Sequence, residues 1–196
     1  MPLPPPAPRH LVHNRIVRCD GWIREDGLWE IEGRMTDSKS YSFTGKQRGV
    51  VAAGAPVHDL WLRLTLGDDF VIRAAMAVTD AAPYRVCGDI VPSYQHLVGL
   101  RVGAGFLEAV RDRFRGVRGC THLTELLGPM ATTAYQTIFA SQEHGKGLIG
   151  RKVPPEPEEG APRRRPGHLG LCHALKLDGP VVEELWPEFA VSRRPA

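Results

Sequence analysis

The strongest constraint on the fold is an alternating apolar run that is followed by a turn and a second run. Residues 57–66, VHDLWLRLTL, carry leucine at every second position from Leu60 to Leu66. A period of two is typical of a strand that buries one face, and His58 stands at the entrance of the leucine face. The tripeptide GDD separates this run from FVIRAAMAVT at 70–79. The pattern predicts an antiparallel hairpin.

An earlier pair of runs predicts a second hairpin. The runs are IVRCDGWIRE at 16–25 and LWEIEGRMTD at 28–37, and they flank Asp-Gly, a common turn dipeptide. In the second run Trp29, Ile31, Gly33 and Met35 alternate with charged residues. Two hairpins predict an antiparallel sheet of about four strands in the N-terminal half.

Helical patterns follow the sheet. A short helix is predicted after Pro92, and AGFLEAVRDRFRG at 104–116 spaces its large apolar residues four apart. Thr121 is a plausible N-cap for a third helix that ends at Gly128-Pro129, and another helix is predicted from there to about Phe139. Strands first and helices afterwards predict an α+β fold, with helices of the C-terminal half packed on the sheet.

Composition divides the chain into an arm, one domain and a tail. Residues 1–12 are rich in proline and predict a flexible arm, and 13–189 are expected to form a single α+β domain. Within that domain, residues 143–169 contain mainly Gly, Pro and charged residues, which predict a loop or linker. Residues 190–196 are expected to be a tail.

Charge and hydrophobicity exclude two classes of partner. The formal net charge is only +3 and no basic stripe is present, so no nucleic-acid partner is expected. No apolar run approaches the roughly 20 residues that span a bilayer, and the N-terminus lacks the apolar stretch of a signal peptide. We therefore expect no membrane association and a cytoplasmic location. Thiols stay reduced there, so the four cysteines are expected to be buried groups, ligands or nucleophiles rather than disulfides. The oligomeric state is left open.

The segment RGCTHLTELL places Cys120 and His122 at the start of a predicted helix. Unpaired N–H groups and the helix dipole favour a thiolate at this position, which suits a nucleophile or a metal ligand. Glu125 shares a helix face with His122 and is predicted to orient its imidazole. The alternative is that Cys120 is simply buried and His122 lies in the capping region.

Further candidate ligands lie at other element boundaries. Cys172 and His173 open the ordered segment that follows the linker, while Cys87 and Asp89 lie where the sheet gives way to helices. We predict a metal site, with zinc as the first candidate, because thiolates and imidazoles suit zinc. Its ligands would come from the following residues: Cys87, Cys120, Cys172, and one of His122, His173 or His58.

Three protein ligands would leave a position for water, whose pKa a bound metal lowers toward neutrality. Such a site could hydrolyse or hydrate a small acyl or carbonyl substrate, with Glu125 or Asp89 handling the proton. Four ligands would instead indicate a structural site or a carrier of sulfur or iron–sulfur clusters.

A metal-free enzyme or binding module is the third alternative. In this hypothesis Trp29, Trp61 and Arg63 hold a small organic anion between sheet and helices, through stacking and charge-assisted hydrogen bonds. Asp59, next to His58, is expected to pair with an arginine, with Arg73 across the hairpin as the candidate.

Several blocks of the sequence resemble an uncharacterised bacterial family, domain of unknown function 2889. The blocks are DGLWEIEGRMTDSKSY, VHDLWLRLTL, APYRVC, GCTHLTELLGPMATTAYQT and CHALKLDGPVV, and the resemblance covers about residues 13–189. The resemblance implies kinship without implying a reaction. It also implies that the family blocks include these residues: Trp29, His58, Asp59, Trp61, Arg63, Cys87, Cys120, His122, Cys172 and His173.

A looser similarity is to iron–sulfur scaffold proteins and their zinc-binding, sulfur-accepting relatives. Their ligands occur as Cys-Gly-Asp, as Gly-Cys at a helix start, and as a late Cys, and the present chain has CGD, GC and CH in the same order. In those proteins strands separate the first two ligands, whereas residues 90–116 read as helical here. The similarity therefore concerns ligand type only.

Overall fold

The computed structural model of the chain describes residues 3–144 and 165–191. The chain divides into two compact units, residues 1–153 and 154–196, which are described separately. The first unit contains the sheet and the long helices. Most of the predicted linker, residues 145–164, lies outside the described residues, as does the tail from 192 onward.

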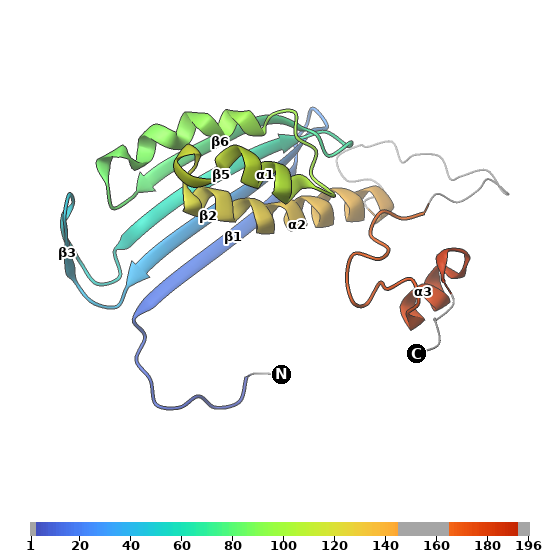
Figure 1. Cartoon of the computed structure of the whole chain (residues 1–196), viewed down its shortest axis with the longest axis horizontal. Helices are drawn as coiled ribbons and strands as arrows, with labels where there is room; N and C mark the ends of the chain where they lie inside the picture. The colour runs from blue at the N-terminus through green and yellow to red at the C-terminus, as the bar shows by residue number, and fades with distance from the viewer. Residues whose placement is uncertain (1–2, 145–164, 192–196) are drawn as a thin grey trace. The chain divides into compact units, whose positions relative to one another are not determined.

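The first unit is built on a four-stranded antiparallel sheet (Figure 1). Its strands run in the order β1-β2-β5-β6, with the bounds His13–Ile23, Trp29–Lys39, Pro56–Leu66 and Ile72–Ala81. Asp26-Gly27 forms the predicted turn between β1 and β2, where Gly27 has a φ of 84° that favours glycine. The predicted sheet is confirmed, and each of the two predicted hairpins is present.

A second, two-stranded sheet lies between β2 and β5 in the sequence. Its strands, β3 (Phe43–Gly45) and β4 (Gly49–Val51), pair antiparallel with each other. This hairpin was not predicted, because strands of three residues are too short to show an alternating pattern.

The helices cover one face of the four-stranded sheet (Figure 1). They comprise the 3-10 helix η1 (Arg85–Leu97), α1 (Phe106–Phe114), the short η2 (Gly116–Arg118) and α2 (Thr121–His144). The predicted α+β class is confirmed. The helix predicted after Pro92 instead begins at Arg85 and contains Pro92, and the helix predicted at 104–116 is present as α1.

The predicted helix break at Gly128-Pro129 is wrong, because α2 continues through both residues. A proline ring clashes with the Cβ of the preceding residue in a helix, and Gly128 has no Cβ. The proline also leaves the carbonyl of Glu125 without its helical donor. Glu125 and Pro129 both lie on the exposed side of the helix, where water can replace that donor.

We expect replacement of Pro129 by alanine to raise the free energy of unfolding by about 1–2 kcal/mol. The substitution restores one backbone hydrogen bond in a helix interior, although part of the gain is offset by a more flexible unfolded chain. Urea unfolding followed by circular dichroism measures the change. Pro180→Ala is the matched control, because Pro180 opens helix α3 (Pro180–Leu185), where no helical donor is missing. An unchanged or lower stability of the Pro129 variant would contradict this account.

The core lies between the helix layer and the inner face of the sheet. Every second residue of β2 and β5 is buried there, and α2 contributes residues spaced three or four apart. The largest completely buried side chains of this layer are Trp29, Tyr94, Ile31, Met35, Leu60, Leu62, Leu64, Leu66, Ile72, Leu97, Leu123 and Leu126.

Helix α2 approaches the sheet closely over two glycines. A Cβ atom at Gly33 would lie 2.6 Å from Sδ of Met130, and one at Gly21 would lie 1.9 Å from Oγ1 of Thr137. Both distances are shorter than atoms can approach without moving. The glycines therefore set how deeply α2 lies on β1 and β2.

Candidate functional site

A buried carboxylate, Asp37, is the centre of the candidate site. Asp37 lies near the end of β2 on the same inward face as Met35, and its side chain is only 2% exposed. The register of the sheet places it opposite Arg15 of β1 and His58 of β5. Because a buried charge is unfavourable without partners, the neighbours of Asp37 determine whether this arrangement is stable.

Arg15 binds both oxygens of this carboxylate. Its Nε donates to Oδ1 at 2.7 Å and its Nη2 donates to Oδ2 at 2.8 Å, while Nη1 donates to Oε2 of Glu125 at 2.7 Å. This two-pronged contact with Arg15 lowers the pKa of Asp37 to about 2, against the opposing effect of burial. Asp37 is therefore ionised throughout the physiological pH range.

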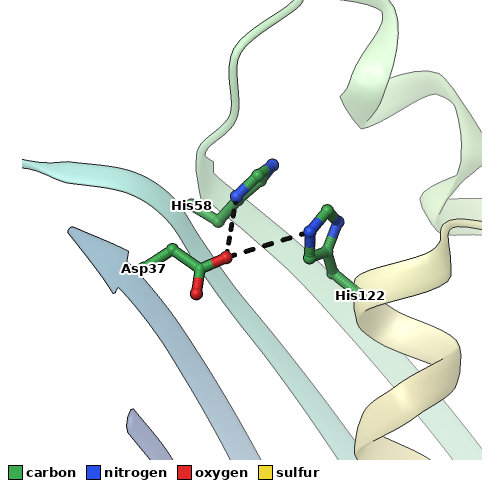
Figure 2. Close-up of side chains that lie close together, drawn as sticks. All are labelled: Asp37, His58 and His122. Carbon is green, nitrogen blue, oxygen red and sulfur yellow. Dashed lines mark hydrogen bonds and ion pairs between the residues drawn. The ribbon is translucent and has the colours of Figure 1, made fainter. Parts of the chain in front are cut away.

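Two imidazoles face the same carboxylate oxygen (Figure 2). Nδ1 of His58 lies 3.0 Å from Oδ2 of Asp37, and Nε2 of His122 lies 3.8 Å from the same atom. The two rings lie against each other, with centroids 3.9 Å apart and planes at 31°. A third histidine, His13, places Nε2 3.2 Å from Oδ1 of Asp37.

The environment of His58 favours a neutral ring. Burial is the largest cause that lowers the pKa of His58, and the neighbouring His122 adds to it, while the hydrogen bond to Asp37 opposes both. A neutral imidazole has a lone pair that is available to a metal ion or a proton.

Tyr94 fixes the start of the helix that carries His122. Its hydroxyl accepts from the backbone N–H of Cys120 at 3.1 Å and lies 2.9 Å from the Cys120 carbonyl and 2.8 Å from Oγ1 of Thr124. The tyrosine ring stacks on Phe114 at 4.7 Å. Because Tyr94 holds the residues on both sides of His122, the position of that imidazole is set by the core.

Asp37, His58 and His122 offer one ligand atom each within 4.8 Å of one another. Among the residues that the structure describes, this is the only such group of three or more. Ligands about 2.1 Å from a tetrahedral zinc ion lie about 3.4 Å apart, and the measured 3.0 Å and 3.8 Å fall on either side of that value. The triad can hold a metal ion once the proton of His58 sits on Nε2, because the Nδ1 that faces Asp37 must then present its lone pair instead of an N–H.

The structure brings together two of the predicted histidine ligands, His58 and His122, and adds Asp37. Glu125 is close by, but it contacts Arg15 rather than the predicted partner His122. His122 lies one helical turn before Glu125, whose carboxylate extends toward β1 and the guanidinium of Arg15.

The cysteines take no part in the triad. Within the described residues, no cysteine joins a group of three candidate ligands, and all four thiols are free. Cys87 and the exposed Asp89 lie in η1, and Cys120 immediately precedes α2. A fourth thiol, Cys19, is half-buried on β1, where burial raises its pKa. Roles for Cys87, Cys120 and Asp89 stay predictions.

Cys172 and His173 are exposed residues of the second unit. This unit contains α3 (Pro180–Leu185) and the short helix η4 (Pro187–Phe189), and it buries Leu169 and Val182. Ordered structure, namely the helices α3 and η4, therefore follows the predicted linker. A metal role for Cys172 and His173 stays a prediction.

The three residues proposed to hold an organic anion lie on two faces of the sheet. Trp29 is buried in the core and donates from Nε1 to Asp68 at 2.8 Å. Trp61 and Arg63 lie on the face away from the helices, where they contact Asp80 and Glu32. A binding role for these side chains stays a prediction, but no single pocket between sheet and helices can contain all three.

Asp59 pairs with Arg34 rather than with the predicted Arg73. Two hydrogen bonds of 2.9 and 2.7 Å join it to Arg34 on the neighbouring strand β2. The register opposes Asp59 to Ala81, at the far end of β6 from Arg73, and Arg73 binds Asp69 instead.

Sequence reasoning missed Asp37, Arg15 and His13. The available signal was the alternation of β2, because Asp37 continues the inward series of Trp29, Ile31, Gly33 and Met35. A carboxylate at a predicted core position requires partners, and that requirement marks a candidate site.

Comparison with known proteins identifies a family but no characterised relative. A family model described as "Protein of unknown function (DUF2889)" matches residues 13–136, a range that includes Asp37, His58 and His122. No curated protein and no solved structure matches the chain. None of the helices in the described residues is long and apolar enough to cross a membrane.

Proposed function

The chain belongs to the family described as protein of unknown function (DUF2889), and we propose that Asp37, His58 and His122 bind a divalent metal ion. The observation that carries this proposal is the convergence of three ligand atoms within 4.8 Å, from three separate elements of the fold. Zinc is the first candidate, because a carboxylate and two imidazoles form known catalytic zinc sites. Ferrous iron is the alternative for the same ligand set.

Arg15 supports the proposal as a partner of the metal-binding carboxylate. Each carboxylate oxygen has two lone pairs, so Oδ2 of Asp37 can accept from Arg15 and bind a cation in place of its hydrogen bond with His58. Hydrogen bonds of this kind orient ligands in metal sites, and their loss weakens metal binding about 10–100-fold.

Three protein ligands leave a position for water, which a bound zinc ion activates at neutral pH. The site is partly open, since the side chains of His58 and His122 are 15% and 27% exposed. We therefore propose hydrolysis or hydration of a small acyl or carbonyl substrate. Glu125, half-exposed and 2.7 Å from Arg15, is the candidate proton acceptor.

Isothermal titration of the chelator-treated full chain with zinc tests metal binding directly. We expect one site in the wild type and at least about 100-fold weaker binding in His58→Ala and His122→Ala, because each variant removes a ligand. His96→Ala is the control, since His96 is exposed in η1 and should leave zinc affinity unchanged.

Absence of stoichiometric binding by zinc and by ferrous iron would overturn the metal proposal. Equal zinc affinity in the wild type and in both histidine variants would do the same. The catalytic part is tested with p-nitrophenyl acetate and the zinc-loaded protein, whose hydrolysis rate should fall in His122→Ala but not in His96→Ala. If the zinc-loaded protein hydrolyses the ester no faster than free zinc does, the hydrolase proposal is rejected and the metal-binding proposal stands.

A further inference from the structure

The two edges of the four-stranded sheet differ in how they are covered. Edge strand β6 is bonded by following residues, because Gly99 donates to the carbonyl of Ile72 at 2.9 Å and Ile72 donates to the carbonyl of Leu100 at 2.8 Å. Edge strand β1 has no such cover, since no other strand of the described residues pairs with its outer side (Figure 1). An uncovered edge presents unpaired backbone donors and acceptors to any strand of suitable sequence.

Strand β1 carries charged side chains at Arg15, Arg18 and Asp20, but it lacks two other features that protect an edge, proline and a bulge. It spans eleven residues, contains no proline or lysine, and pairs with β2 without a bulge. Its outward-facing side chains include Ile16 and Trp22, which are 56% and 54% exposed. A long, regular edge with exposed apolar side chains is suited to pairing with another strand.

The sequence of β1 is complementary to itself in one antiparallel register. If a two-fold axis passes through Cys19, Arg18 lies opposite the partner's Asp20, and Ile16 lies opposite the partner's Trp22. All four side chains are on the sheet face away from the helices, where Arg18 and Asp20 already form an ion pair at 2.8 Å within one chain. The pairing would join two such ion pairs into one network and bring two apolar pairs together.

The neighbouring registers are less favourable. In this antiparallel pairing each side chain stays on its own face of the sheet, so the two-fold axis always passes at a residue. Each alternative register therefore moves the axis from Cys19 to another residue of β1. An axis at Arg18 would oppose two arginines, and an axis at Asp20 would oppose two carboxylates. Like charges directly opposite each other destabilise a sheet, so charge selects the axis at Cys19.

We propose that the chain forms a homodimer in which β1 pairs antiparallel with β1 of a second copy, with the two-fold axis at Cys19. The result is a continuous eight-stranded sheet with an isologous interface. This proposal is independent of the metal site, because the interface side chains named above lie on the opposite face of the sheet.

Sedimentation equilibrium of the full chain tests the oligomeric state. We expect a mass twice the 21.6 kDa of the single chain, and about tenfold weaker dimerisation for Arg18→Asp, which faces the partner's Asp20 with a like charge twice per dimer. The double variant Arg18→Asp/Asp20→Arg exchanges the charges and is expected to restore the wild-type dimer. Circular dichroism verifies that each variant is folded.

Cross-linking tests the register. In a background in which all four native cysteines are replaced by serine, Ile16→Cys/Trp22→Cys should form a covalent dimer on mild oxidation, whereas either single cysteine variant should not, because equivalent positions lie about 20 Å apart across the axis. This background is needed because the axis places Cys19 directly opposite the partner's Cys19. A monomeric wild type, or a dimer that is insensitive to Arg18→Asp, would overturn the proposal. Cross-linking as efficient in a single variant as in the double variant would reject this register.

Discussion

Replacing Asp37 with alanine is expected to lower the free energy of unfolding by about 2–3 kcal/mol, a size typical of losing hydrogen bonds to a charged group when the other charge, Arg15, stays partly exposed. The substitution removes the common partner of Arg15, His58 and His122, and leaves Glu125 as the remaining carboxylate partner of the guanidinium. Urea unfolding at neutral pH measures the change. Asp89→Ala is the control, because Asp89 is exposed and should alter stability by less than about 0.5 kcal/mol. A loss for Asp37→Ala as small as that of the control would contradict the buried network.

The same network makes a prediction about acid stability. The pKa of Asp37 is about 2 in the folded chain and 3.8 as the ordinary value, so its ionised form stabilises the fold above pH 4. That contribution, about 2 kcal/mol, is lost as pH falls from about 4 to 2. The stability difference between wild type and Asp37→Asn should therefore shrink over this pH range. A difference that does not depend on pH would show that the charge of Asp37 is not the stabilising feature.

Replacing Gly33 with leucine is expected to destabilise the fold by about 3 kcal/mol, the upper range for overpacking a core. Even the Cβ of the new side chain would lie 2.6 Å from Sδ and 2.9 Å from Cγ of Met130, so α2 would have to move away from the sheet. Thermal or urea unfolding measures the loss.

Two variants make the Gly33 experiment specific. Met130→Ala removes the contacting atoms, so the double variant Gly33→Leu/Met130→Ala should recover part of the stability lost in Gly33→Leu relative to the Met130→Ala background. Gly88→Leu is the positional control, because a Cβ at Gly88 meets no atom within 4 Å. Strictly additive effects of the Gly33 and Met130 substitutions would argue against their contact.

The alternation of apolar and polar residues predicted the four-stranded sheet correctly. Rules that depend on single residues, such as the ending of a helix at a proline, were less successful. The runs around Leu60 and Trp29 are long enough for a period of two to be unambiguous, and both became central strands. The break at Pro129 failed because Gly128 removes the steric conflict that usually ends a helix. The three-residue strands β3 and β4 carry too few positions for any periodic signal.

The candidate site was only partly accessible to sequence reasoning. His58 and His122 were predicted as ligands because they lie at the start of a strand and at the start of a helix. Their proximity to each other and to Asp37 depends on the register of the strands, which the sequence does not reveal. Residues 22 positions apart, such as Arg15 and Asp37, come together through the β1–β2 pairing. The inward position of Asp37 follows from the alternation of β2, but nothing in the local sequence marks which residues meet it from β1, β5 and α2.

Because α2 contacts Gly21 closely, a substitution at Gly21 is expected to affect residues far along the same helix. Thr137, which fills the space beside Gly21, stands fifteen residues along the same helix from His122, or about 22 Å by helical rise. Helix α2 is continuous between these positions, so a bulkier side chain at Gly21 would push Thr137 away from β1 and would also shift the imidazole of His122, to the extent that the helix does not bend at Pro129. If Asp37, His58 and His122 bind a metal ion as proposed, a substitution at Gly21 is therefore expected to weaken that binding although every ligand is intact.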